Sequence, residues 1–168
     1  AVETMHTVVT PAVYAEAREL IAAHREAGHA VVIISASASV LVRPIAEALG
    51  IEHVVATELA EEDGRFTGEI LHYRKGPAKA EALAEMARAL GVDPGASFAY
   101  SDSATDIPML EQVGHPVAVN PDRRLKKYAA EQGWEVRTFK DPVPLFSAPS
   151  AREVGIGSAV VAGLAALV

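Results

Sequence analysis

The chain has 168 residues and a mass of 17.7 kDa, the size of one ordinary domain, and half of its residues are apolar although only 5% are aromatic. Its 15 basic and 22 acidic residues give a net charge of −7 without a basic patch, so no nucleic-acid partner is expected. The sequence contains no cysteine, which excludes disulfides, thiolate metal sites and cysteine nucleophiles within it. We expect a cytoplasmic protein, a location that is compatible with this composition.

The first half of the sequence predicts helices alternating with strands. Thr10-Pro11 is a favourable helix start and Gly28 a favourable stop, which indicates a helix over 12–27. A strand at 30–34 follows, and its run of β-branched residues predicts burial on both faces. The next expected elements are a helix at 39–49, a strand at 53–57, a hairpin turn at Asp63-Gly64 and a helix at 78–90.

The second half continues this alternation. We expect a strand at 97–101, a short helix at 106–112, a strand at 116–120, a helix at 122–132 and a strand at 134–138. Alternating strands and helices predict an α/β fold of three layers, in which a doubly wound, mostly parallel sheet is covered by helices on both faces. The hairpin is then a small β insertion, and residues 1–139 form the core domain.

The remaining residues differ in composition from this core. Residues 140–153 contain Pro142, Pro144 and Pro149 and are interpreted as a linker. Residues 154–168 form an apolar tail without any charge, shorter than the roughly 20 residues that a membrane-spanning helix requires. Three interpretations stay open: a buried or exposed tail, a membrane anchor cut short, and a helix that binds a membrane surface or a partner. Membrane association through this tail is therefore one of the expectations.

Polar residues that could carry chemistry follow the predicted strands. In an open parallel sheet, ligands bind beyond the carboxyl ends of the strands. Ser35 follows the strand at 30–34, and Asp102 and Asp106 follow the strand at 97–101. Two carboxylates at such an edge suit Mg²⁺, which prefers one or two carboxylates together with water and phosphate oxygens. Lys79 lies at a predicted helix start, where its charge could steady a phosphate.

This order of residues resembles the haloacid dehalogenase (HAD) superfamily, and in particular its phosphoserine-phosphatase-like branch, HAD-IB. The second family motif resembles the strand that ends in Ser35, the third resembles Gly-Pro-Ala-Lys79, and the fourth resembles Asp102-Ser-Ala-Thr-Asp106. The resemblance extends over about residues 8–139. It implies an HAD-like core and a Mg²⁺-dependent phosphomonoester hydrolase that acts through an aspartyl-phosphate intermediate on a small phosphorylated metabolite.

The resemblance also implies roles for individual residues. Ser35 and the adjacent Ala36, together with Lys79 and Thr105, would bind the phosphate, and Lys79 would also bridge it to the nucleophile. Asp102 would bind Mg²⁺, and Asp106 would support the metal site or orient Lys79. The catalytic set is then Lys79, Asp102 and Asp106. Thr105 lies where the family commonly has Asn.

One departure from the family is larger. Its first motif, a strand followed by D-x-D that supplies the nucleophile, is absent, because no two Asp residues of this sequence are separated by a single residue. Most of the helical cap is missing too. We therefore expect a partial core that lacks a central strand and is inactive alone. The alternatives are a non-catalytic relative that binds phosphate or metal in a regulatory role, and a different doubly wound protein. Neither the substrate nor the oligomeric state is determined by the sequence.

Overall fold

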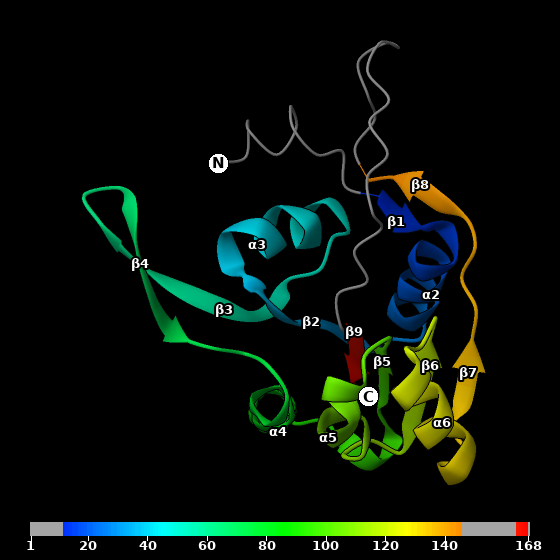
Figure 1. The fold of residues 1–168 in the computed structure, drawn as a ribbon. Coiled ribbons are helices and arrows are strands. Elements are labelled where there is room, and N and C mark those ends of the chain that lie inside the picture. The colour runs from blue at the N-terminus through cyan, green and yellow to red at the C-terminus, as the bar shows by residue number, and fades with distance from the viewer. Residues whose placement is uncertain (1–11, 146–163, 168) are drawn as a thin grey trace.

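Strands and helices alternate in the computed structural model, which describes residues 12–145 and 164–167 (Figure 1). The helices are α2 (Ala15–Glu26), α3 (Ser39–Ala48), α4 (Pro77–Leu90), α5 (Ile107–Leu110) and α6 (Arg123–Gln132), with 3-10 turns η1 (Pro94–Ala96) and η2 (Ala104–Asp106). The strands are β1 (Ala12–Tyr14), β2 (Ala30–Ala38), β3 (His53–Glu62), β4 (Arg65–His72), β5 (Phe98–Ser101), β6 (His115–Val119), β7 (Glu135–Arg137), β8 (Pro142–Pro144) and β9 (Leu164–Leu167).

The main sheet of the described residues has the order β4-β3-β2-β9-β5-β6-β7. β3 and β2 are parallel neighbours, as are β5, β6 and β7. β9 is antiparallel to both β2 and β5, so these two strands are parallel to each other. The five strands β3, β2, β5, β6 and β7 therefore end at the same edge of the sheet, which confirms the predicted mostly parallel α/β fold.

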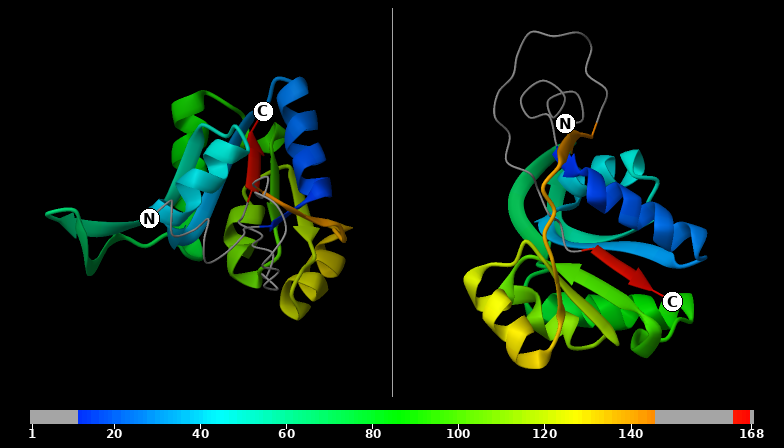
Figure 2. Two further views of the ribbon diagram at one scale, coloured as in Figure 1. Left: turned by 90° about the horizontal axis from the view of Figure 1, so that it is seen from above. Right: turned by 90° about the vertical axis from the view of Figure 1, so that its right-hand side faces the viewer.

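Helices cover the sheet on both faces, as the sequence predicts (Figure 2). α2 and α3 lie on one face, where Ile21, Val42 and Ala46 pack against Val31 and Ile33. α4, α5 and α6 lie on the other (Figure 1). Because side chains alternate along a strand, successive residues of the β-branched run in β2 supply both cores. This run is the strongest reason for the three-layer arrangement.

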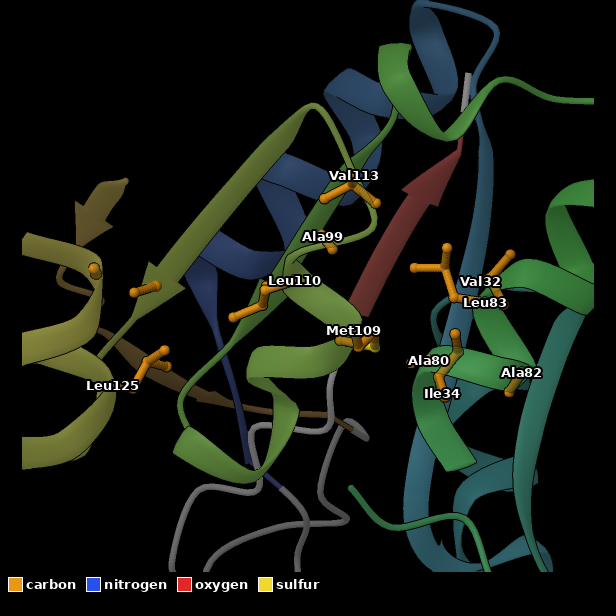
Figure 3. Close-up of a cluster of buried hydrophobic side chains, with 12 residues drawn as sticks. Val32, Ile34, Ala80, Ala82, Leu83, Ala99, Met109, Leu110, Val113 and Leu125 are labelled. Atoms are coloured by element: carbon orange, nitrogen blue, oxygen red, sulfur yellow. The ribbon is translucent and has the colours of Figure 1, made fainter. Parts of the chain in front are cut away.

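The larger core lies between the sheet and helices α4, α5 and α6 (Figure 3). Its centre is fully buried and consists of aliphatic side chains and one methionine: Val32, Ile34, Leu83, Met109, Leu110 and Leu125. Small residues, among them Ala82 and Ala99, allow the helices to approach the strands closely. The low aromatic content noted in the sequence is thus compensated by close packing of Ala, Val, Leu and Ile.

The described structure differs from the sequence prediction near the first helix. The helix begins at Ala15 rather than at residue 12, because Ala12–Tyr14 forms strand β1, antiparallel to β8. β8 lies within 140–153, the region interpreted as a linker. Proline cannot donate a ladder hydrogen bond, so strands that contain it are usually edge strands. The Thr10-Pro11 start itself lies outside the described residues.

The centre of the sheet also differs from expectation. We predicted that a central strand is missing, and β9, from the apolar tail, occupies a central position between β2 and β5. The other residues of the tail lie outside the described part of the chain. In that described part, no helix combines the length and apolarity needed to cross a membrane. The membrane contact expected of the tail stays a prediction.

Strands β3 and β4 form a hairpin that projects from the body of the molecule (Figure 1). β3 extends to Glu62, beyond the expected strand at 53–57, because its second half pairs only with β4. All residues of β4 are exposed, including Phe66 and Ile70. The hairpin returns the chain to the sheet directly before α4, so its base leads into the segment that carries Lys79.

Candidate active site

The predicted site residues gather at the carboxyl edge of the parallel strands. Ile33 of β2 and Tyr100 of β5 both pair with Leu164 of β9. Ser35 lies two residues after Ile33 and Asp102 two residues after Tyr100, so both follow the paired part of these strands at this edge. Neighbouring strands are about 4.8 Å apart, so two strand spacings separate these residues by about 10 Å. The edge thus holds a hydroxyl and a carboxylate at a distance that a phosphate with a metal ion could bridge.

A buried ion pair forms the centre of the candidate site. Lys79 Nζ donates to Asp106 Oδ2 at 2.7 Å, and the two residues are only 7% and 1% exposed. Ser101 Oγ donates to the same oxygen at 2.7 Å, and Thr105 Oγ1 donates to Asp106 Oδ1 at 3.3 Å. Both carboxylate oxygens of Asp106 therefore already accept hydrogen bonds. These contacts favour the role of orienting Lys79 over direct coordination of a metal.

The start of α4 holds Lys79 in this position. Gly76 is the N-cap residue with a positive φ of 59°, and Pro77 occupies the first helical turn. Lys79 N donates to Gly76 O at 2.9 Å. A Cβ atom at residue 76 would lie 3.8 Å from Thr105 O, so this turn runs close to the loop that carries Asp106. Glycine is favoured here because side chains rarely adopt this backbone conformation.

Asp102 differs from Asp106 in its surroundings. It is half-buried, and among the described residues no hydrogen bond or ion pair joins its side chain to another residue. Burial raises the pKa of its carboxyl above the usual value. A hydrogen bond from its own backbone N–H and the charge of Lys79 oppose this rise, whereas the charges of Asp106 and Asp122 add to it. A partly buried carboxylate of this kind is stabilised by a cation. Asp102 is thus the carboxylate that is free to bind one.

Asp122 was not singled out in the sequence, although it organises the loop behind Asp102. Its N–H donates to Asp102 O at 2.7 Å, and its carboxylate accepts from Ala104 N and Leu125 N, each at 2.8 Å. These backbone donors lower the pKa of Asp122. An Asp directly before a predicted helix is a common N-cap, so the contact with Leu125 N could have been predicted from the sequence. The contacts to 102 and 104 required the tertiary structure.

The Ser35 side of the edge is connected to the β3–β4 hairpin. Ser35 is buried, and its Oγ accepts from Ser37 N at 3.1 Å where β2 departs from its ladder. Thr57 Oγ1 donates to Ala36 O at 2.8 Å and accepts from Arg74 N at 3.1 Å. Among the described residues no hydrogen bond joins Ser35 to the Lys79 pair. The structure therefore brings these groups to one edge without direct contact.

The other predicted phosphate contact, Thr105, is exposed. Its Oγ1 is hydrogen-bonded to Ser103 Oγ at 3.0 Å in addition to Asp106. Sequence reasoning missed Ser101, whose hydroxyl shares the Asp106 oxygen with Lys79. A serine directly before an acidic pair is too common to be a signal. Its role appears only once Asp106 folds back over the end of β5.

The donor atoms near Asp102 decide whether the site suits the predicted Mg²⁺. In the described ranges, no three His, Asp, Glu or Cys side chains are grouped as a ready-made metal centre. The uncommitted carboxylate of Asp102 nevertheless fits Mg²⁺, which commonly uses one or two carboxylates and completes its shell with water and phosphate. An open hollow of about 570 Å³, lined by Phe98, His115 and Trp134 among others, lies at the opposite, amino-terminal edge of the strands. It is not part of this site.

Comparison with known proteins identifies the family of the chain. The family of haloacid dehalogenase-like hydrolases matches residues 1–111, a range that contains all the site residues predicted from the sequence. A Mycobacterium tuberculosis protein described as a probable phosphatase is 49% identical over 168 residues, covering 98% of this chain and 58% of that protein. A phosphoserine phosphatase of the same organism is 38% identical over 167 residues, covering 97% of this chain and 51% of the other.

A solved structure shows the same fold. A phosphoserine phosphatase determined as an analogue of its phospho-aspartyl intermediate is 27% identical, with a TM-score of 0.66, over 83% of this chain and 64% of the other. The chain spans between half and three-fifths of the length of the two relatives named above. Because the family match covers most of the chain and the fold agrees, the chain belongs to the haloacid dehalogenase-like hydrolase family.

Proposed function

We propose that this chain supplies the phosphate- and cation-binding part of a Mg²⁺-dependent phosphomonoester hydrolase that acts through an aspartyl-phosphate. The observation that carries the proposal is the buried Lys79–Asp106 pair beside the carboxylate of Asp102, which is paired with no other described residue. Phosphoryl transfer depends mainly on positioning and on stabilising charge at the transferring group. A held cation and a free carboxylate at one sheet edge meet that requirement.

Each residue has a task that follows from its contacts. Lys79 places a positive charge toward the phosphoryl oxygens, and Asp106 with Ser101 keeps its ammonium group from rotating away. Ser35, whose hydroxyl lies where β2 departs from its regular ladder, donates to a phosphoryl oxygen. Asp102 would hold Mg²⁺. When bound, this ion would neutralise charge on the phosphate and orient it for in-line attack.

The proposal requires a nucleophilic carboxylate in the D-x-D form that these 168 residues do not contain. This observation favours a second candidate, in which the chain binds phosphate or metal without turnover and serves a regulatory or interaction role. The position of β9 between β2 and β5 is compatible with that candidate, because the sheet is continuous there. The two candidates share the binding site and differ in whether phosphate is released.

The product of the complete reading frame that contains this chain is the right material for the test. We expect it to release inorganic phosphate from small phosphomonoesters such as L-phosphoserine, and to lose this activity when Mg²⁺ is chelated. Asp102→Asn is expected to abolish most turnover. Lys79→Ala is expected to lower kcat more than it raises KM, because the charge is needed most as the phosphoryl group transfers. Lys127→Ala, at an exposed lysine, is the matched control.

The outcomes separate the candidates. Mg²⁺-dependent release that fails in Asp102→Asn supports the hydrolase. Binding of Mg²⁺ and phosphate without any release supports the non-catalytic candidate. Near-normal turnover of Asp102→Asn contradicts the assignment of the site, as does an effect of Lys79→Ala confined to KM. A product that binds neither Mg²⁺ nor phosphate contradicts both candidates.

A further inference from the structure

Arg74 lies in the loop between β4 and α4 and is not used by the function proposed above. Its side chain is half-buried, and its Nε atom is covered yet has no hydrogen-bond partner. In the described part of the chain, its guanidinium takes part in no ion pair. Arginine is always charged and carries five N–H donors, so a covered donor without an acceptor is costly. Such a group is expected to have a partner when the protein works.

The backbone of Arg74 is fixed beside the candidate phosphate site. Its N–H donates to Thr57 Oγ1, and the same hydroxyl donates to Ala36 O, next to Ser35. Thr57 is only 4% exposed, so this bridge is shielded from water. Two hydrogen bonds therefore connect the backbone of Arg74 to the end of β2.

The loop from Arg74 to Lys79 also reaches the other side of the site. Gly76 approaches Thr105 O, and Lys79 is paired with Asp106. The carboxylate of Asp106 balances the positive charge of Lys79 within the protein, so a ligand would share the Lys79 ammonium group with Asp106. Arg74 has no such internal counterion among the described residues. The loop thus carries a cation without an internal counterion, and its backbone is anchored at the edge where a phosphate would bind.

We propose that Arg74 binds an oxyanion of the substrate at this edge. The planar fork of the guanidinium matches the oxygens of a phosphate or a carboxylate, which it can contact with two parallel hydrogen bonds. The oxyanion is either the phosphoryl group itself or a second acidic group on the same substrate. This inference rests on the proposed site, although it requires binding alone and not turnover.

The test compares Arg74→Gln with Lys75→Gln in the product of the complete reading frame. Lys75 is the exposed neighbour in the same loop, so both variants remove one positive charge at nearly the same place. Binding of inorganic phosphate is measured by titration calorimetry with Mg²⁺ present. Kinetics are compared for L-phosphoserine, which has a carboxylate, and for phosphoethanolamine, which has none. Thermal melting verifies folding, and Arg74→Lys keeps the charge without the fork.

We expect Arg74→Gln to weaken the binding of the oxyanion that Arg74 contacts by about tenfold or more, as for the loss of a charge-assisted hydrogen bond. Arg74→Lys should show an intermediate loss, and Lys75→Gln should stay within twofold of wild type. Weaker binding of inorganic phosphate assigns Arg74 to the phosphoryl group. A rise in KM confined to L-phosphoserine assigns it to a second acidic group.

Two results would overturn the inference. One is an Arg74→Gln protein with wild-type phosphate affinity and wild-type KM for both substrates, which leaves the proposed function intact. The other result is an equal loss of affinity in Arg74→Gln and Lys75→Gln, which would show a general effect of charge. A wild-type protein that binds no phosphate at all refutes the proposed function together with this inference, so the two failures are distinguishable.

Discussion

Breaking the buried pair between Lys79 and Asp106 tests the centre of the site through stability alone. The two charged atoms are 2.7 Å apart, and the side chains are 8% and 2% exposed. Two unit charges at this separation attract by about 6 kcal/mol at an effective dielectric constant of about 20, a gain that is opposed by the cost of removing both from water. Replacing Asp106 with Asn removes one charge with little change of shape. The remaining buried ammonium of Lys79 is then uncompensated.

We expect Asp106→Asn to lower the free energy of unfolding by about 3–5 kcal/mol, the usual cost of stranding one member of a buried pair. Glu131→Gln is the control, because its pair with Lys127 is 3.7 Å long and both side chains are largely exposed. It should cost roughly 0–1 kcal/mol. Urea unfolding followed by circular dichroism measures both values.

A double-mutant cycle with Lys79→Met isolates the interaction itself. The double variant removes both charges, so it should lose less stability than the sum of the two single variants, by about 1–3 kcal/mol. An Asp106→Asn protein within 1 kcal/mol of wild type would refute the reasoning. A coupling energy near zero would show that the two side chains do not stabilise each other. It would contradict the role of Asp106 in positioning Lys79.

Three further predictions concern other parts of the molecule. Asp102→Asn should raise the melting temperature without Mg²⁺, because it removes a partly buried, unpaired carboxylate, and should lower Mg²⁺ affinity by more than about tenfold; calorimetry that finds unchanged affinity contradicts the metal site. Burial lowers the pKa of His24, whose Nε2 is 2.7 Å from Tyr100 Oη, so the unfolded chain takes up the proton first as pH falls. Stability should therefore be full above about pH 6.5 and should decline below it, with a shallower decline in His24→Gln; equal slopes in urea titrations at pH 5–8 would argue against this. Gly114→Ala should lower the free energy of unfolding by about 1–3 kcal/mol or more, since its Cβ would lie 1.8 Å from Gly95 O, and a neutral effect in thermal melting would show that the backbone can move apart.

The sequence alone predicted the α/β architecture and the placement of the candidate site residues at one edge of the sheet. The four β-branched residues before Ser35 place apolar side chains on both faces of their strand. Each face must therefore be covered by a helix, which is typical of a parallel sheet between two helical layers. Asp102 and Asp106 were singled out because they follow a parallel strand, and parallel strands end at one edge of the sheet. Lys79 was singled out because it lies at a helix start and matches a family motif.

Contacts between distant residues were decided only by the tertiary structure. The hydrogen bonds of Ser101, Thr57 and Arg74 join positions from 5 to 21 residues apart, and no local pattern distinguishes these side chains from ordinary surface ones. Strand β1 is another example: the local sequence favours a helix from residue 12, but pairing with Pro142–Pro144 makes Ala12–Tyr14 a strand.

The apolar tail shows the physical reason most clearly. An uncharged run of about 15 residues satisfies the requirements of a buried strand, a helix or a membrane segment equally well, since each of them removes apolar side chains from water. Hydrogen-bonding partners distinguish between them. Strands β2 and β5 each present an edge with unpaired backbone groups, and residues 164–167 pair with both. Such pairing joins residues more than 60 positions apart, so it can be specified only when the whole sheet is assembled.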